Sequence, residues 1–185
     1  SLAPGQSVII KPIAKIPTIS ANATAKKTTD ILPQNLQVTI GTSKIPLKSL
    51  TYYTALDSSK ADAPSARYTF DLSLSADQIA NAKLLHLAEL SDMAKVRING
   101  KDIGMIWSLP FQLAIPAGIL QEQNQVEIEV VSNSANRIRK MDQKGVVWKN
   151  FYEINFVDIR YKPFDASKWP IEDGGLQGKI YFTNR

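Results

Sequence analysis

The chain has 185 residues, of which 44% are hydrophobic and 21% charged, a balance typical of a folded domain and not of a disordered chain. It has no cysteine and a single histidine, which excludes disulfides, thiolate zinc sites, a cysteine nucleophile and metal sites built from several histidines. The net charge of +5 comes from the first 50 residues, and no apolar run approaches the roughly 18 residues of a membrane span, so neither nucleic acid nor a membrane is an expected partner.

The first 35 residues are expected to form an N-terminal strand and a linker that follow a preceding region. Ser7–Lys11 is a short apolar run that ends at Pro12, which is typical of a strand. Residues 12–35 are poor in bulky apolar side chains and rich in Ala, Thr, Lys and Pro, as linkers are. The N-terminus has neither an initiator Met nor a signal-peptide pattern, so we expect a chain cut from a longer protein. The folded domain is predicted to span 36–185.

From residue 36 onward, short strands alternate with turns. In Arg67–Leu74, the apolar residues occupy every second position, which is the pattern of a half-buried strand. Ser75 is placed to cap a single helical turn after this strand. The other expected strands are Leu36–Ile40, Leu84–Leu90, Met93–Ile98, Asp102–Trp107, Phe111–Ile115, Val126–Val130, Trp148–Tyr161 and Gly178–Phe182.

The dipeptide Asn99-Gly100 is the strongest local signal in the chain. Both residues tolerate positive φ, which a two-residue hairpin turn of type I′ requires. About ten short strands and few helical segments predict an all-β antiparallel sandwich or barrel. A parallel α/β fold would need helices of about 10–15 residues between the strands, and no segment supplies them.

Several sequence stretches carry a resemblance to a known domain. They include Ala66–Phe70, Leu84–Val131, which contains G-M-I-W-S-L-P-F after the Asn-Gly turn, the N-S-A-N-R-I that begins at Asn133, and Gly174–Gly178. Together they resemble the C-terminal galactose-binding-like β-sandwich (jelly roll) of family 106 α-L-rhamnosidases and, behind it, the sugar-binding-like accessory domains of family 2 glycoside hydrolases. Two positions depart from the family pattern, Glu89 in place of Gly and Ser134 in place of Trp.

The resemblance implies a non-catalytic accessory domain of a carbohydrate-degrading enzyme. Its implied partner is a catalytic barrel domain of the same parent chain, against which this domain would pack. Binding of an oligo- or polysaccharide is a further role that the resemblance allows. It implies a periplasmic or extracellular location and no cofactor, although domains of this fold often hold a structural calcium. Two alternatives stay open: an autonomous carbohydrate-binding module, and a small glycosidase in its own right.

Aromatic and polar side chains are the candidates for carbohydrate binding. Trp107, Trp148 and Trp169 have flat rings that can stack on the C–H face of a sugar, or else fill the core or an interdomain contact. We favour packing for Trp107 and Trp148 and leave both readings open for Trp169. Asn133, Asn136 and Arg137 can bind hydroxyl or carboxylate groups, or simply cap and solvate a loop, which is the reading we favour.

No catalytic or metal-ligating residue is assigned. His86 alternates with Leu85 and Leu87, so we expect it on the opposite face of its strand, at the surface or partly buried. Glycoside hydrolysis usually needs two converging carboxyl groups, whereas the alternation places Asp71, Glu127 and others outward or in turns.

Overall fold

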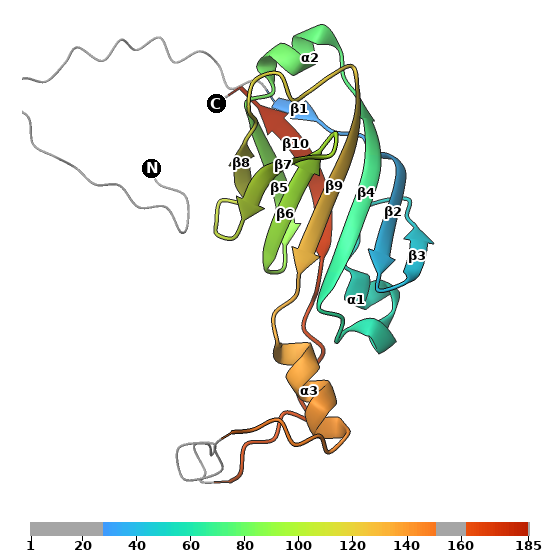
Figure 1. Cartoon of the computed structure of the whole chain (residues 1–185), viewed down its shortest axis with the longest axis vertical. Coiled ribbons are helices and arrows are strands. Elements are labelled where there is room, and N and C mark those ends of the chain that lie inside the picture. Colours follow the sequence, from blue (N-terminus) through green and yellow to red (C-terminus); the bar gives the residue numbers. More distant parts are fainter. Residues whose placement is uncertain (1–27, 151–161, 185) are drawn as a thin grey trace, which may run out of the picture.

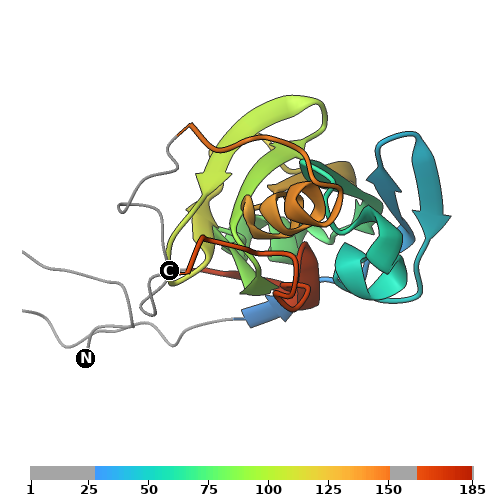
Figure 2. The same ribbon diagram turned by 90° about the horizontal axis from the view of Figure 1, so that it is seen from below.

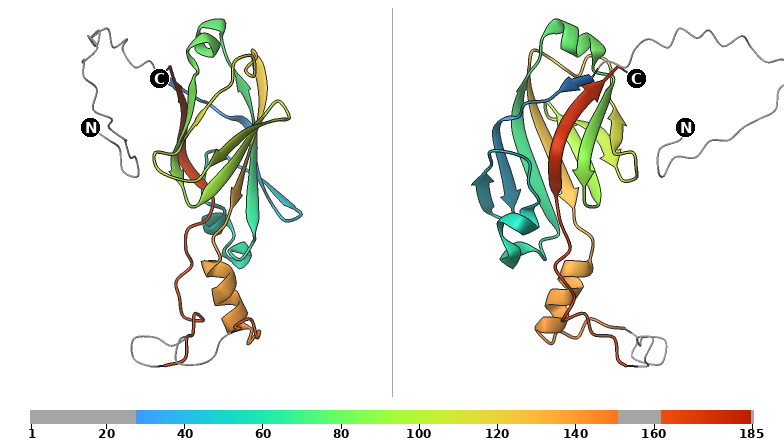
Figure 3. Two further views of the ribbon diagram at one scale, coloured as in Figure 1. Left: turned by 60° about the vertical axis from the view of Figure 1, so that its left-hand side comes forward. Right: turned by 180° about the vertical axis from the view of Figure 1, so that it is seen from behind.

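The computed structural model describes residues 28–150 and 162–184, which form two antiparallel β-sheets packed face to face (Figure 1, Figure 3). One sheet has four strands in the order β1 (Thr28–Asp30), β10 (Leu176–Thr183), β5 (Leu84–Leu90) and β8 (Gln112–Ala114). The other has six, in the order β3 (Ser43–Pro46), β2 (Gln34–Ile40), β4 (Ser65–Ser73), β9 (Gln123–Val131), β6 (Met93–Ile98) and β7 (Lys101–Ile106). The predicted antiparallel β-sandwich is confirmed.

The core lies between the sheets because the strands alternate as their sequences indicate. In β4, Tyr68, Phe70 and Leu72 are buried while the residues between them face outward. β9 pairs with β4 along its whole length and contributes Val126, Ile128 and Val130 to the same layer. Each such side chain contributes roughly 1.5–3 kcal/mol when it leaves water, so this layer is the main source of stability.

The Asn99-Gly100 turn joins β6 to β7 as predicted, with φ of 53° and 74°. Asn99 has a second role, because its side-chain amide donates to Asn124 Oδ1 at 3.0 Å and its Oδ1 accepts from Gln125 N at 2.9 Å. Asn124 is itself buried and donates to Gln121 O at 2.6 Å. The hairpin is therefore pinned to the start of β9 by side-chain amides.

Short helices close the two ends of the sandwich. Ser75 caps α2 (Ala76–Asn81) through a capping box with Gln78, as the sequence predicts. At the opposite end, α1 (Tyr53–Leu56) and the 3₁₀ turn η1 (Ser58–Lys60) cover the core beside Gly174 and Gly175.

Gly174 and Gly175 are needed because two buried tyrosines occupy the space beside them. A Cβ on Gly175 would lie 2.3 Å from Tyr68 Oη, and one on Gly174 would lie 2.9 Å from the Tyr53 ring. The Tyr68 hydroxyl donates to Thr51 O at 2.9 Å and accepts from Leu176 N at 3.2 Å. Gly174 and Gly175 therefore allow the backbone to pack directly on the two tyrosines at this end of the sandwich.

Several predictions need correction. Thr28–Asp30, placed in the linker, forms β1 and pairs with β10, so the sandwich begins before residue 36. The strand expected at Ser7–Lys11 and most of the one expected at Trp148–Tyr161 lie outside the described residues, and Trp148–Asn150 is not a strand. His86 is not at the surface: it is 6% exposed, stacks on Tyr181 and lies 2.8 Å from the Thr183 hydroxyl.

The polar segment after β9 is a helix, not a loop. It forms α3 (Ala135–Gln143), which projects beyond the end of the sandwich (Figure 1, Figure 3) and lies in front of the strands when the molecule is seen from below (Figure 2). Asn133 Oδ1 accepts a hydrogen bond from Ala135 N at 2.9 Å just before the helix starts, whereas the N-cap residue itself is Ser134, whose side chain makes no capping bond. The helix was missed because the groups that hold it, such as the backbone of Glu172 and Trp169, come from distant parts of the chain.

Candidate functional site

A hollow of about 450 Å³ opens at the end of the sandwich where Met93 pairs with Val131, the last residue of β9 before α3. Its walls come from the turn between β5 and β6, the start of β6, and the segment between β7 and β8. The residues that line it are Ser91, Asp92, Met93, Trp107, Ser108, Leu109 and Phe111.

The hairpin register puts Trp107 at the rim of this hollow. Ala94 pairs with Ile106, so the next residues outward, Met93 and Trp107, lie at the same end of the β6–β7 hairpin. Trp107 is 73% exposed, so it does not fill the core of this domain, and packing against another domain, the other part of that expectation, stays a prediction. Phe111, by contrast, packs against the core and is held by the hydrogen bond from Leu87 N to its carbonyl oxygen at 2.9 Å.

Two polar side chains that line the hollow accept backbone hydrogen bonds. Asp92 Oδ2 accepts from Asn133 N at 3.0 Å, and Ser91 Oγ accepts from Gly175 N at 2.8 Å. Asp92 Oδ1 has no hydrogen-bond partner within residues 28–150 and 162–184. The hollow thus combines an exposed indole with an immobilised carboxylate.

A second cluster of candidate residues lies along α3, away from this hollow. Asn136 is buried and exchanges two hydrogen bonds with the backbone of Glu172, each 2.9 Å long. Arg139 donates to Trp169 O at 2.6 Å, and Gln143 donates to Ser167 O at 2.9 Å. One face of α3 is therefore bound to the segment that returns to β10.

Asp142 organises the end of α3. It accepts hydrogen bonds from Trp148 Nε1 at 2.6 Å and from Ala166 N at 2.8 Å, and Lys149 Nζ lies 3.6 Å away. Burial raises the pKa of the Asp142 carboxyl, but these hydrogen bonds and the charge of Lys149 outweigh burial and lower the pKa overall. Trp148 is half-buried edge-on against Phe164, with ring centroids 6.0 Å apart.

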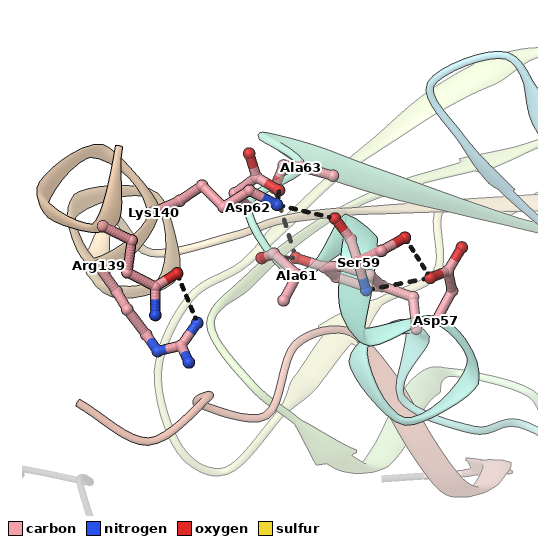
Figure 4. Close-up of polar contacts among 9 residues, drawn as sticks. Asp57, Ser59, Ala61, Asp62, Ala63, Arg139 and Lys140 are labelled. Carbon is pink, nitrogen blue, oxygen red and sulfur yellow. Dashed lines mark hydrogen bonds and ion pairs between the residues drawn. The ribbon is translucent and has the colours of Figure 1, made fainter. Parts of the chain in front are cut away.

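Lys140 joins α3 to the rest of the domain. Its Nζ donates to Ser59 O at 3.2 Å and lies 3.5 Å from Asp62 Oδ1, and both partners belong to the η1 region that caps the sandwich (Figure 4). Within η1, Asp57 accepts from Ser59 through both the backbone and the hydroxyl. α3 is therefore bound to the η1 region through Lys140 as well as to the segment before β10 through Asn136.

The structure divides the predicted binding residues into two groups. Trp107 lines the hollow, and Asn133 lies next to it without lining it, because its backbone N–H donates to Asp92. Asn136, Trp148 and Trp169 belong to the α3 cluster, where Trp169 is 39% exposed and meets Phe164 edge-on at 5.4 Å.

Arg137 is exposed on α3 and has no hydrogen bond or ion pair to any other described residue. The sequence reasoning missed Ser91 and Asp92 as wall residues, because it assigned Asp92 only to a turn. The signal available was their place next to Met93, at the end of the hairpin that displays Trp107.

The carboxyl groups with resolved shifts are poor candidates for a general acid. A glycosidase acid needs a raised pKa. In the described part of the chain, the pKa of each of these carboxyls is lowered. The largest cause is the hydrogen bond from the Ser59 side chain at Asp57, the bond from Lys95 at Asp102 and the bond from the Ser167 backbone at Asp165. The pKa of Asp142 is lowered for the reasons given above.

On the outer face of the six-stranded sheet, acids are paired with cations. Glu127 lies 2.9 Å from Arg97, and Glu129 lies 3.9 Å from Arg67. The described ranges contain no group of three or more His, Asp or Glu side chains that could hold a metal ion. Among the helices in those ranges, none combines the length and hydrophobicity needed to cross a bilayer.

No protein-family model and no curated protein matches the chain. Solved structures do match it. A rhamnosidase from Novosphingobium sp. PP1Y superposes with a TM-score of 0.67 at 20% identity, over 88% of this chain and 16% of that chain. A β-glucuronidase from Ruminococcus gnavus has a TM-score of 0.52 at 11% identity, over 85% and 28% of the two chains. A GH2 β-galacturonidase from Eisenbergiella tayi has a TM-score of 0.50 at 16% identity, over 85% and 24%.

These likenesses establish the fold. The chain resembles a portion of glycoside hydrolase chains, and it spans about a sixth to about a quarter of the lengths of these matches. At such identities, activity does not transfer with the fold.

Proposed function

We propose that this chain is a non-catalytic accessory β-sandwich domain of a larger glycoside hydrolase of the α-L-rhamnosidase type. The observation that carries the proposal is the superposition of 88% of the chain on 16% of a rhamnosidase chain. The motif of Leu84–Val131, which forms β5 to β9, supports family 106 in particular. In this proposal a catalytic barrel domain of the same protein is the partner against which the sandwich packs.

The chemistry of the described residues supports a structural role. The Asp carboxyls named above have lowered pKa values, and Glu127 and Glu129 on the outer face are paired with Arg97 and Arg67. None of these is the protonated carboxyl that glycosidic cleavage uses. The periplasmic or extracellular location is part of the same proposal, because polymeric substrates of such enzymes lie outside the cytoplasm.

Hydrolysis of 4-nitrophenyl α-L-rhamnopyranoside tests the proposal, measured for the 185-residue chain and for the complete gene product from which it comes. We expect release of 4-nitrophenol by the complete product and none by this chain. Hydrolysis by the isolated chain would favour a glycosidase in its own right. A complete product without a further barrel-sized region would also overturn the accessory role.

A second candidate function, carbohydrate binding, is favoured by one observation. Trp107 projects from the end of β7 and is 73% exposed beside a hollow. Together with Met93 and Leu109 it forms an exposed apolar patch, and such a patch is typical of a surface that binds a ligand or a partner.

A further inference from the structure

We infer that the hollow beside Trp107 is a binding site for a neutral pyranose ring, stacked on the Trp107 indole and hydrogen-bonded to Asp92. The inference rests on the proposed function for its choice of a carbohydrate and goes beyond it by assigning a site, a pose and a charge preference. The contacts that carry it are all in the described part of the chain.

The hollow is lined by exposed apolar side chains. Trp107, Leu109 and Met93 are 73%, 48% and 38% exposed, and all three line the same hollow. A flat indole edged by aliphatic and thioether groups matches the C–H face of a pyranose, which is apolar although the ring's edge carries hydroxyls. Stacking on that face removes apolar area from water on both partners.

The hollow also offers hydrogen-bonding groups to the edge of a sugar ring. Asp92 Oδ2 is used by Asn133 N, whereas Oδ1 is without a described partner, and the hydroxyl of Ser108 is also on the wall. A carboxylate is a strong acceptor for sugar hydroxyls, and such charge-assisted bonds are about twice as strong as neutral ones. The apolar platform and the polar wall together suit a ring that has one apolar face and hydroxyls at its edge.

Hydrogen bonds within the domain hold the walls of the hollow in place before any ligand binds. Asn133 N fixes Asp92, Gly175 N fixes Ser91, and Leu87 N fixes the backbone at Phe111. A site that needs little ordering on binding loses less free energy to entropy. The volume of about 450 Å³ lies within the range of roughly 300–1,000 Å³ that is usual for small-molecule sites.

The charge of Asp92 sets the preference. A uronate brings its own carboxylate, and two like charges in one small hollow repel each other. Among the lining residues there is no Arg or Lys to compensate. The site should therefore accept neutral pyranosides and discriminate against the matched uronates.

Binding can be measured on the 185-residue chain by tryptophan fluorescence and by saturation-transfer NMR. The probes are the neutral methyl pyranosides of glucose, galactose, mannose and rhamnose, with methyl glucuronide as the charged match for the glucoside. We expect millimolar binding of at least one neutral probe, with saturation strongest at the ring C–H protons of one face. The glucuronide should bind at least fivefold more weakly than the glucoside.

Two variants and a control locate the site. Trp107→Ala should weaken binding at least tenfold without changing the melting temperature, because the side chain is mostly in solvent. Asp92→Asn should weaken binding of the neutral sugar and reduce the ratio of its affinity to the affinity for the uronate. Trp169→Ala, which removes the partly exposed indole of the α3 cluster, should leave binding unchanged.

The outcomes separate this inference from the proposed function. Absence of binding by every neutral probe, or loss of binding in Trp169→Ala but not in Trp107→Ala, overturns the sugar site. If no probe binds and Trp107→Ala instead lowers the melting temperature of the complete gene product, Trp107 is a contact between domains. The accessory role would then stand while the sugar site falls.

Discussion

The side chain of Asn136 forms two hydrogen bonds with the backbone of a single distant residue, Glu172. Asn136 Nδ2 donates to Glu172 O, Asn136 Oδ1 accepts from Glu172 N, and both distances are 2.9 Å. Such an amide pair imitates the pairing of two β-strands, although here one partner is a side chain on a helix. It holds α3 to the segment that leads into β10.

Asn136→Ala should destabilise the domain by roughly 1–3 kcal/mol, since it leaves the backbone N–H and C=O of Glu172 without partners at a site where Asn136 is only 5% exposed. The free energy of unfolding from urea titration measures this. Arg137→Ala is the matched control, because Arg137 is the next residue of α3 and is exposed; we expect a change within about 0.5 kcal/mol. Equal effects of the two substitutions would contradict the clamp.

Tyr68 should make the domain sensitive to alkaline pH. Burial raises the pKa of the Tyr68 phenol to about 12, so the folded state favours the neutral form. Because the folded pKa exceeds the ordinary value of about 10, stability is complete below about pH 10 and is lost as pH rises toward 12. The loss should reach about 3 kcal/mol.

Urea unfolding at a series of alkaline pH values, compared with Tyr68→Phe, isolates this contribution. The variant should cost about 1–3 kcal/mol at neutral pH, since Leu176 N and Thr51 O lose their partner. It should also lose less stability between pH 10 and 12 than the native chain does. Parallel pH profiles for the two proteins would show that another group dominates the alkaline transition.

Gly175→Ala should be among the most damaging single substitutions at a glycine. Gly175 has a φ of 118°, and the added Cβ would lie 2.3 Å from the Tyr68 hydroxyl, itself fixed by two hydrogen bonds. We expect a loss above about 2 kcal/mol or a failure to fold. Gly118→Ala is the control, because its φ of 76° is also positive but its Cβ meets no atom within 4 Å. That variant should lose only about 1 kcal/mol, as judged by thermal unfolding.

Asp142 should control acid stability at the end of α3. Its pKa is lowered in the folded state, so its contribution is present above the ordinary pKa of an aspartate, about 3.9, and is lost as pH falls through the lower folded value. Protonation weakens the acceptor for Trp148 Nε1 and the attraction to Lys149. Trp148 emission should therefore shift to the red in acid.

Asp142→Asn supplies the comparison, and Trp107→Phe together with Trp169→Phe in both proteins leaves Trp148 as the one tryptophan that emits. The variant should show red-shifted emission already at neutral pH and little further change in acid. If its acid transition matches that of the native carboxylate, the hydrogen bonds at Asp142 do not govern this end of the helix.

Local sequence determined several strands and turns of this protein, although not the short edge strands β1 and β3. The alternation in Arg67–Leu74, the Ser75 cap and the Asn99-Gly100 turn each act through neighbours within a few residues, so each could be predicted and was confirmed. The same holds for the two-sheet architecture, because period-two alternation along many short strands leaves two apolar faces that can be buried only against each other.

Tertiary structure alone decided which candidate side chains meet solvent. Trp107 and Trp148 looked equivalent in sequence, yet the first stands at an exposed hairpin end and the second is hydrogen-bonded to Asp142 against Phe164. The role of Asn136 depends on Glu172, 36 residues further along the chain. Such contacts follow from how distant segments pack together, and no local pattern of residues specifies them.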